Sequence, residues 1–105
     1  MAEENATLEF LAPAEFEWDE DKNAANLAKH GIDFDDAIGI FYGPIVVRQS
    51  NRNNEERWIA IGTSDDRLMT VIYTRRNDVI RIISARHPRQ NEKRAHRDAS
   101  VGRPA

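Results

Sequence analysis

The segment Val79-Ile80-Arg81-Ile82-Ile83-Ser84-Ala85-Arg86 decides the fold, because its β-branched residues predict a strand near the end of the chain. Arg81 lies inside this apolar run and Arg86 lies at its exit. A permanent charge in or beside a core is unfavourable unless it meets a counter-charge or faces a polar cleft. Further basic residues follow the strand, so a cleft at this position would suit a polyanion, and RNA is the leading candidate.

The alternation of side chains along a strand assigns each arginine to a face of the sheet. Arg81 shares its side with Ile83, whereas Arg86 shares the opposite side with Ile82. The two arginines therefore lie on opposite faces unless a bulge intervenes near Ser84. A single site built from both arginines requires such a bulge.

Three more short strands are predicted before this segment, over residues 45–49, 57–62 and 68–74. Polar connections of two to six residues join the four strands, and such short connections favour an antiparallel meander. Pro88 ends the last strand, and residues 89–99 are predicted to form a closing helix of low apolar content.

Two helices are predicted before the meander. Asp19 is a good N-cap for a helix over residues 20–30, and Gly31 supplies its C-terminal stop. Asp33 caps a second, short helix that ends at Gly43-Pro44. The predicted fold class is therefore α+β: two N-terminal helices, a four-stranded antiparallel sheet and a C-terminal helix.

The chain of 105 residues is long enough for one domain with a single core. We expect this domain to span residues 15–99. Residues 1–14 form an N-terminal extension that can be disordered, and residues 100–105 form a frayed tail. Phe16-Glu17-Trp18 is expected either to start a short strand or to pack as an aromatic anchor.

The composition excludes several classes of protein. The absence of cysteine excludes disulfides, thiolate metal sites and a cysteine nucleophile. No window approaches the ~20 apolar residues of a membrane span, and the acidic start Met1-Ala-Glu-Glu-Asn lacks the apolar core of a secretory signal. We therefore expect a cytoplasmic protein that makes no contact with a membrane.

The charge of the chain is strongly divided, although the total is only −3. Residues 1–36 hold eleven acidic and two basic residues, whereas residues 37–105 carry a net charge of +6. The bases are twelve Arg and three Lys, and Arg binds phosphate oxygens with two donors at once. A GC-rich genome explains the excess of Arg equally well. The division itself predicts a basic face for phosphate.

Cleavage of RNA without a metal requires activation of a ribose 2′-OH, stabilisation of charge on phosphorus and protonation of the leaving 5′-oxygen. Fixed cations aimed at the developing charge are often the largest catalytic contribution. Arg81 and Arg86 are the best candidates for this role, and Arg57 is the next. The alternative for Arg81 is an ion pair with Glu56 or Asp78.

The candidates for the general base are His30, Lys29 and Glu56. His30 can instead cap its helix, and Glu56 can instead orient Arg57. His87 is expected to contact RNA or to act as an acid. The three histidines are scattered along the sequence, so we expect neither a metal site nor another cofactor. Further backbone contacts are expected from basic residues that could also form an ordinary solvated face: Arg75, Arg76, Arg89, Arg94 and Arg97.

Taken in order, several of these motifs resemble the BrnT family, the toxins of a type II toxin–antitoxin system. They are Phe16-Glu17-Trp18-Asp19, Lys29-His30-Gly31, Glu56-Arg57, Arg81-Ile82-Ile83-Ser84-Ala85-Arg86 and Glu92-Lys93-Arg94. The resemblance implies a RelE-like fold and a metal-independent ribonuclease that arrests translation. It also implies a BrnA-type ribbon-helix-helix antitoxin, through which alone the complex would bind and repress its own operon. The chain departs from the family at His96, where an aromatic residue, usually Tyr, is common, and in the extension 1–14.

Three functions remain possible at this level. The first is a toxin ribonuclease that cuts mRNA, with the ribosome as a possible location. The second is an inactive binding module that acts as a co-repressor with its antitoxin, which the His96 departure favours. The third is a plain nucleic-acid-binding domain, which the acidic N-terminal segment makes less attractive.

Overall fold

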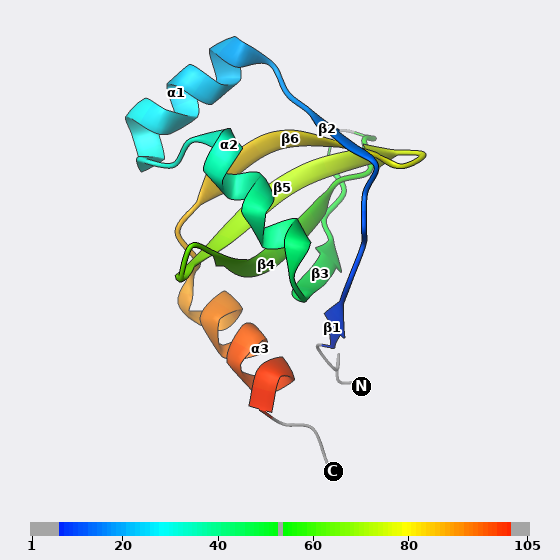
Figure 1. The fold of residues 1–105 in the computed structure, drawn as a ribbon, viewed down its shortest axis with the longest axis vertical. Helices are drawn as coiled ribbons and strands as arrows, with labels where there is room; N and C mark the ends of the chain where they lie inside the picture. The colour runs from blue at the N-terminus through cyan, green and yellow to red at the C-terminus, as the bar shows by residue number, and fades with distance from the viewer. Residues whose placement is uncertain (1–6, 53, 102–105) are drawn as a thin grey trace.

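The computed structural model describes residues 7–52 and 54–101, which fold into a sheet with helices on both sides (Figure 1). The sheet consists of β1 (Leu8–Glu9), β2 (Glu15–Glu17), β3 (Ile45–Gln49), β4 (Trp58–Ser64), β5 (Arg67–Arg76) and β6 (Val79–Arg86). The helices are α1 (Glu20–His30), α2 (Phe34–Ala37), the 3-10 helix η1 (Ile38–Tyr42) and α3 (Gln90–Val101). In the view of Figure 1, α1 lies at the upper left of the sheet, α2 crosses in front of the strands, and α3 lies below them.

The strand order, β1-β3-β4-β5-β6-β2, corrects the predicted fold. The described part of the sheet has six strands, and it is mixed because β2 pairs with β6 in parallel while the other neighbours are antiparallel. The prediction of two N-terminal helices followed by a four-stranded antiparallel sheet is therefore wrong, since β1 and β2 precede the helices. With two and three residues, these strands are too short for an alternating pattern to identify them. The four-stranded arrangement that was expected as RelE-like is therefore not the fold of this chain.

The segment around Phe16 is a short strand and also packs as an anchor. In β2, Phe16 lies opposite Ile80 of β6, and its ring centroid is 5.5 Å from that of Phe41. The backbone N–H of Ala14 donates to the carbonyl of Asp78 at 2.9 Å, which holds the segment beside the start of β6. Long-range contacts rather than local sequence preference therefore place this strand.

The expected extension and tail fall partly beyond the described structure. Residues 1–6 and 102–105 lie outside the described residues. Within the expected extension, Leu8 and Glu9 form β1 and pair with β3. Residues 100 and 101 complete α3.

Helix α1 has the bounds that its end signals predict. The side chain of Asp19 accepts hydrogen bonds from the backbone N–H groups of Asp21 and Lys22, which would otherwise lack partners. Gly31 ends the helix in the left-handed region at a φ of 72°, where a side chain would be strained, and donates to the carbonyl of Leu27. Local sequence is therefore sufficient to define this helix.

The main core lies between the sheet and the segment formed by α2 and η1. Fully buried side chains from the segment include Phe34, Ile40 and Phe41, and the sheet contributes Val71, Tyr73, Ala60, Ile80, Ile82 and Ala85. The predicted second helix begins after Asp33 as expected but becomes a 3-10 helix at Ile38. Gly39 allows this tight turn to approach Ser64, because a Cβ at Gly39 would collide with the Ser64 side chain.

Helix α3 covers one end of the opposite face of the sheet. Ala99 packs against Val46 and Ile61 in a second, smaller cluster of buried residues. Because the contacting residues of the helix are small, α3 lies close to the strands without burying much apolar surface. None of the described helices is long and apolar enough to cross a membrane.

Candidate functional site

A register shift in the sheet places Arg81 and Arg86 on one face. Thr74 of β5 lies opposite Arg81, and Thr70 lies opposite Arg86. Thr70 and Thr74 are four residues apart and therefore share a face, so the arginines opposite them share it too. The shift falls between Ile72 and Tyr73 of β5 and leaves Ile83 of β6 as the extra residue of a bulge.

This shared face, which we call the arginine face, is the one opposite the main core. The Cα atoms of Arg81 and Arg86 are about 14 Å apart along this face, because four residue spacings of about 3.4 Å separate their partners on β5. Arg57 directly precedes β4 and lies two residues before Ile59, so the two side chains point to the same face. Ile59 lies opposite Ile72, which belongs to the arginine face. The bulge that a single site built from both arginines requires is therefore present.

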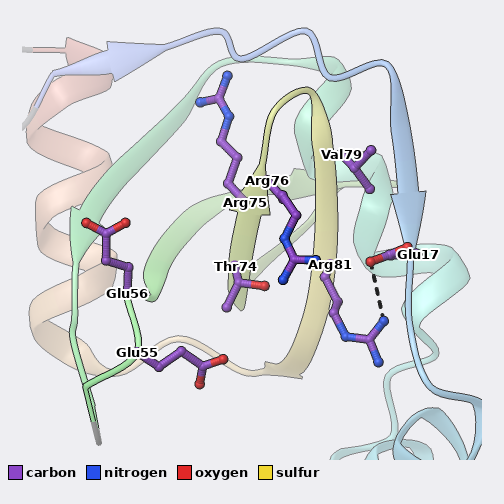
Figure 2. A pocket seen from close by; sticks show the side chains of 8 residues that line it. All are labelled: Glu17, Glu55, Glu56, Thr74, Arg75, Arg76, Val79 and Arg81. Carbon is purple, nitrogen blue, oxygen red and sulfur yellow. Dashed lines mark hydrogen bonds and ion pairs between the residues drawn. The ribbon is translucent and has the colours of Figure 1, made fainter.

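One end of the arginine face is hollowed into an open cleft of about 170 Å³ (Figure 2). Its lining residues come from β2, the β3–β4 connection, β5 and β6: Glu17, Glu55, Glu56, Thr74, Arg75, Arg76, Val79 and Arg81. Figure 2 shows Glu55 and Glu56 on one side of the cleft, across from Arg76 and Arg81. Carboxylates and guanidinium groups from segments far apart in the sequence therefore share one solvent-open space.

Two arginines in and beside the cleft, Arg81 and Arg57, form ion pairs that water can reach. Arg81 Nη1 lies 3.4 Å from Glu17 Oε2, and both side chains are about half exposed. Arg57 donates from Nε to Glu55 Oε1 at 2.9 Å, and its Nη2 lies 2.8 Å from the same oxygen. Exposed pairs of this kind contribute little to stability, so a phosphate can compete for the guanidinium groups. Glu17 rather than Glu56 or Asp78 pairs with Arg81.

Arg86 is held much more firmly, by Glu92 at the start of α3. Its Nη1 and Nη2 donate to Oε1 and Oε2 of Glu92 at 2.8 and 2.9 Å, and only 16% of the Arg86 side chain and 6% of the Glu92 side chain are exposed. Glu92 also accepts hydrogen bonds from the Thr70 hydroxyl and the backbone N–H of Arg89. Burial works to raise the pKa of Glu92, but these hydrogen bonds and the charge of Arg86 lower it to about 2.

Lys29 and His30 lie at the C-terminal end of α1 and do not line the cleft. Lys29 is exposed, and His30 is half buried one turn after Asn26. Asn26 bonds to β6 next to Arg86, so the end of α1 lies near the Arg86 end of the arginine face. His87 and Arg89 lie in the connection from β6 to α3, and Arg94 is exposed on α3.

Of the predicted site residues, the cleft therefore unites Glu56, Arg75, Arg76 and Arg81, with Arg57 paired at its rim. Two features escaped the sequence analysis, namely Glu17 and the buried Asn26. Glu17 belongs to the short strand β2, for which the sequence analysis predicted no ion-pairing role, and Asn26 looks like an ordinary polar residue of an amphipathic helix. Within residues 7–52 and 54–101, no group of three or more His, Asp or Glu side chains is placed to hold a metal ion.

Comparison with known families bears directly on this arrangement. Residues 18–92 match the model of a family described as the ribonuclease toxin BrnT of a type II toxin–antitoxin system. The chain belongs to the BrnT family. The matched region begins at Trp18 and ends at Glu92, so it contains all the cleft residues except Glu17 and includes the Arg86–Glu92 pair. No curated protein matches the chain.

Membership of the BrnT family fixes the general function. The protein is a ribonuclease toxin of a type II system, so its substrate is RNA and its partner is a protein antitoxin. His96 lies in α3 beyond the matched region, and burial lowers its pKa. The match over residues 18–92 confirms the BrnT family that the sequence motifs indicated.

Proposed function

We propose that this BrnT protein is a metal-independent endoribonuclease that cuts mRNA in the open cleft and thereby arrests translation. The observation that carries the proposal is the placement of Glu55 and Glu56 across the cleft from Arg76 and Arg81. A carboxylate can take a proton from a ribose 2′-OH, and the arginines can stabilise the charge that develops on phosphorus. The action takes place in the cytoplasm, where mRNA is translated and where the ribosome can present it.

The proposed reaction begins when the Glu56 carboxylate removes the proton of the 2′-OH. The 2′-oxygen then attacks the adjacent phosphorus, the bond to the 5′-oxygen breaks, and a 2′,3′-cyclic phosphate remains. Arg81 stabilises the charged phosphoryl oxygens, while Arg75 and Arg76 hold neighbouring phosphates and Arg57 fixes Glu55 at the rim. Water in this open cleft supplies the proton that the leaving 5′-oxygen needs.

The other end of the arginine face offers a second candidate base. His30 and Lys29 lie near the Arg86 end, with His87 and Arg89 in the next connection. In this version His30 removes the proton, Lys29 and Arg86 bind the phosphate, and His87 serves as the acid. The bidentate Glu92 pair leaves Arg86 less free than Arg81, which favours the cleft. In the cleft version, His87, Arg89 and Arg94 contact the RNA backbone.

The antitoxin is proposed to be a BrnA-type ribbon-helix-helix protein that covers the cleft with an acidic or amphipathic segment. Arg75, Arg76 and Arg81 supply the charge that such a segment would meet. The toxin would then contact operator DNA only through the antitoxin. Covering the cleft would block RNA cleavage and leave the DNA-binding part of the partner free.

A second candidate function is that of an inactive co-repressor. Arg57, Arg81 and Arg86, the three arginines proposed for catalysis, each have a carboxylate partner in the structure, which favours this alternative. His96 in α3, where an aromatic residue was expected, points the same way. In that case the protein would bind its antitoxin and assist repression without cutting RNA.

Induction of the chain alone in a bacterium, with growth and RNA integrity followed together, separates the two functions. We expect growth arrest with discrete cuts in mRNA, and relief of both effects by Glu56→Gln or Arg81→Gln. Arg67→Gln, at the exposed first position of β5, is the matched control and should stay toxic. Normal growth with intact RNA, despite soluble expression, would refute the ribonuclease proposal and favour the co-repressor.

A further inference from the structure

Arg48 of β3 lies on the arginine face but has no place in the proposed reaction. It lies opposite Ile59 of β4, which lies opposite Ile72 of β5, which in turn lies opposite Ser84 of β6. Residues directly opposite each other share a face, so these four side chains form one row across the sheet. Ser84 belongs to the face of Arg81, and the row therefore borders the cleft.

Among the residues that the structure describes, none compensates the charge of Arg48. Arg48 is half buried, yet over residues 7–52 and 54–101 its guanidinium has neither a carboxylate at ion-pair distance nor a hydrogen bond. Arg57, its diagonal neighbour directly before β4, is paired with Glu55 and so differs in this respect. A fixed cation without a partner, close to other cations, favours the binding of an anion from outside.

The row between Arg48 and Ser84 is also only partly covered. Helix α3 packs on the next row, where Val46 and Ile61 are completely buried, whereas Ile59 and Ile72 are only partly buried. An apolar strip bordered by cations suits a single-stranded nucleic acid, because the cations bind phosphates and the flat bases can cover aliphatic side chains and remove them from water. Arg48 at one end of the row and the neighbouring arginines of the cleft are positively charged, which favours binding of RNA over binding of an apolar peptide.

We propose that Arg48 binds a phosphate of single-stranded RNA next to the nucleotide in the cleft, with a base lying over Ile59 and Ile72. This inference rests on the proposed function, because it extends the RNA path from the cleft across β5 and β4 to β3. Arg48 is thus a substrate-binding residue and takes no part in the proton transfers. Its loss should weaken binding of RNA while leaving the chemical step nearly unchanged.

The test measures binding of a single-stranded 2′-O-methyl RNA, which cannot be cut because its 2′-oxygens are blocked. Fluorescence anisotropy of the full-length protein is recorded over a range of salt concentrations. For Arg48→Met, which keeps the apolar stem but removes the charge, we expect Kd to rise about five- to tenfold at low salt. The slope of log Kd against log salt should fall by about 0.7, the value for one lost phosphate contact on a single strand.

Two further variants control this measurement. Arg48→Lys keeps a charge and should retain most of the binding and the salt slope, and Arg67→Gln, at the start of β5, should behave as the wild type. With unmodified RNA, Arg48→Met should raise KM about as much as Kd and leave kcat nearly unchanged. Thermal unfolding of each variant verifies that it is folded.

Equal Kd values and salt slopes for Arg48→Met and Arg67→Gln would overturn the inference and show that the Arg48 stem merely covers Ile59. Weakened binding of the antitoxin with unchanged binding of RNA would also overturn it, because the surface would then belong to the partner. The proposed function can fail separately: a wild type that binds RNA without cutting it refutes the ribonuclease proposal, while the Arg48 contrast still stands.

Discussion

The side-chain amide of Asn26 forms hydrogen bonds with both backbone groups of Ala85. Its Oδ1 accepts from the N–H of Ala85 at 3.2 Å, and its Nδ2 donates to the carbonyl at 2.9 Å. In a sheet these partners would come from a neighbouring strand, but β2 ends opposite Arg81. Asn26 therefore takes the place of a strand beside the second half of β6 and holds the end of α1 against it. Nδ2 also donates to the carbonyl of Ile32.

Replacing Asn26 should destabilise the fold strongly for a polar residue. Asn26→Ala leaves the backbone groups of Ala85 and Ile32 without partners at a buried position, so we expect a loss of about 2–4 kcal/mol in the free energy of unfolding. Asn26→Asp should be nearly as harmful, because a carboxylate cannot donate to the two carbonyls. Urea denaturation measures both losses. Asn91→Ala, at an exposed position in α3, is the control; an equally small effect for all three variants would contradict this role of Asn26.

The Glu92 carboxylate should make the stability of the fold depend on acid pH. Its pKa is lowered from 4.5 to about 2, so its contribution is complete above pH 4.5 and is lost as the pH falls towards 2. A difference of this size corresponds to roughly 3 kcal/mol. Urea denaturation at a series of pH values between 2 and 6 measures the loss.

Glu92→Gln should remove most of this dependence and should itself destabilise the protein, because Arg86 would remain buried without its counter-charge. The matched control is Asp98→Asn, since Asp98 is exposed and contacts Arg97 only at 3.7 Å. The role assigned to Glu92 would be wrong if Asp98→Asn and Glu92→Gln flattened the pH dependence equally.

Substitutions in the cleft should reduce the rate of RNA cleavage without unfolding the protein. Glu56→Gln removes the proposed base and should slow cleavage about 10²–10⁴-fold. Arg81→Gln removes the proposed stabilising charge and should slow it about 10²–10³-fold. Initial rates on an end-labelled RNA, compared with the exposed control Asp66→Asn, measure both effects. Full activity of Glu56→Gln together with an inactive His30→Gln would move the base to the end of α1.

Cleavage should proceed undiminished in the presence of a chelator. The proposed reaction uses a carboxylate base and arginine cations, so it requires no divalent ion. Rates are compared in EDTA, in added magnesium and in neither, with thermal unfolding as a control for stability. Loss of activity in EDTA that magnesium restores would point to a metal enzyme.

Local physics allowed part of this fold to be predicted from the chain alone. Asp19 and Gly31 define α1 because capping groups act on the backbone beside them. The apolar run of β6 identified a strand, and short polar connections indicated that β3 to β6 follow one another as antiparallel neighbours. The motifs within residues 16–94 also pointed to the BrnT family, which the match over residues 18–92 confirms.

Only the tertiary structure decided the features that depend on residues far apart in the chain. Strand β2 exists because Phe16 meets Ile80 and Phe41 across more than twenty residues, and no local pattern carries that information. The bulge at Ile83 brings Arg81 and Arg86 to one face, whereas a strict period of two would separate them. The counter-charges also depend on the tertiary structure. The sequence shows that Arg81 and Arg86 need partners, but only packing in three dimensions brings Glu17 and Glu92 to them.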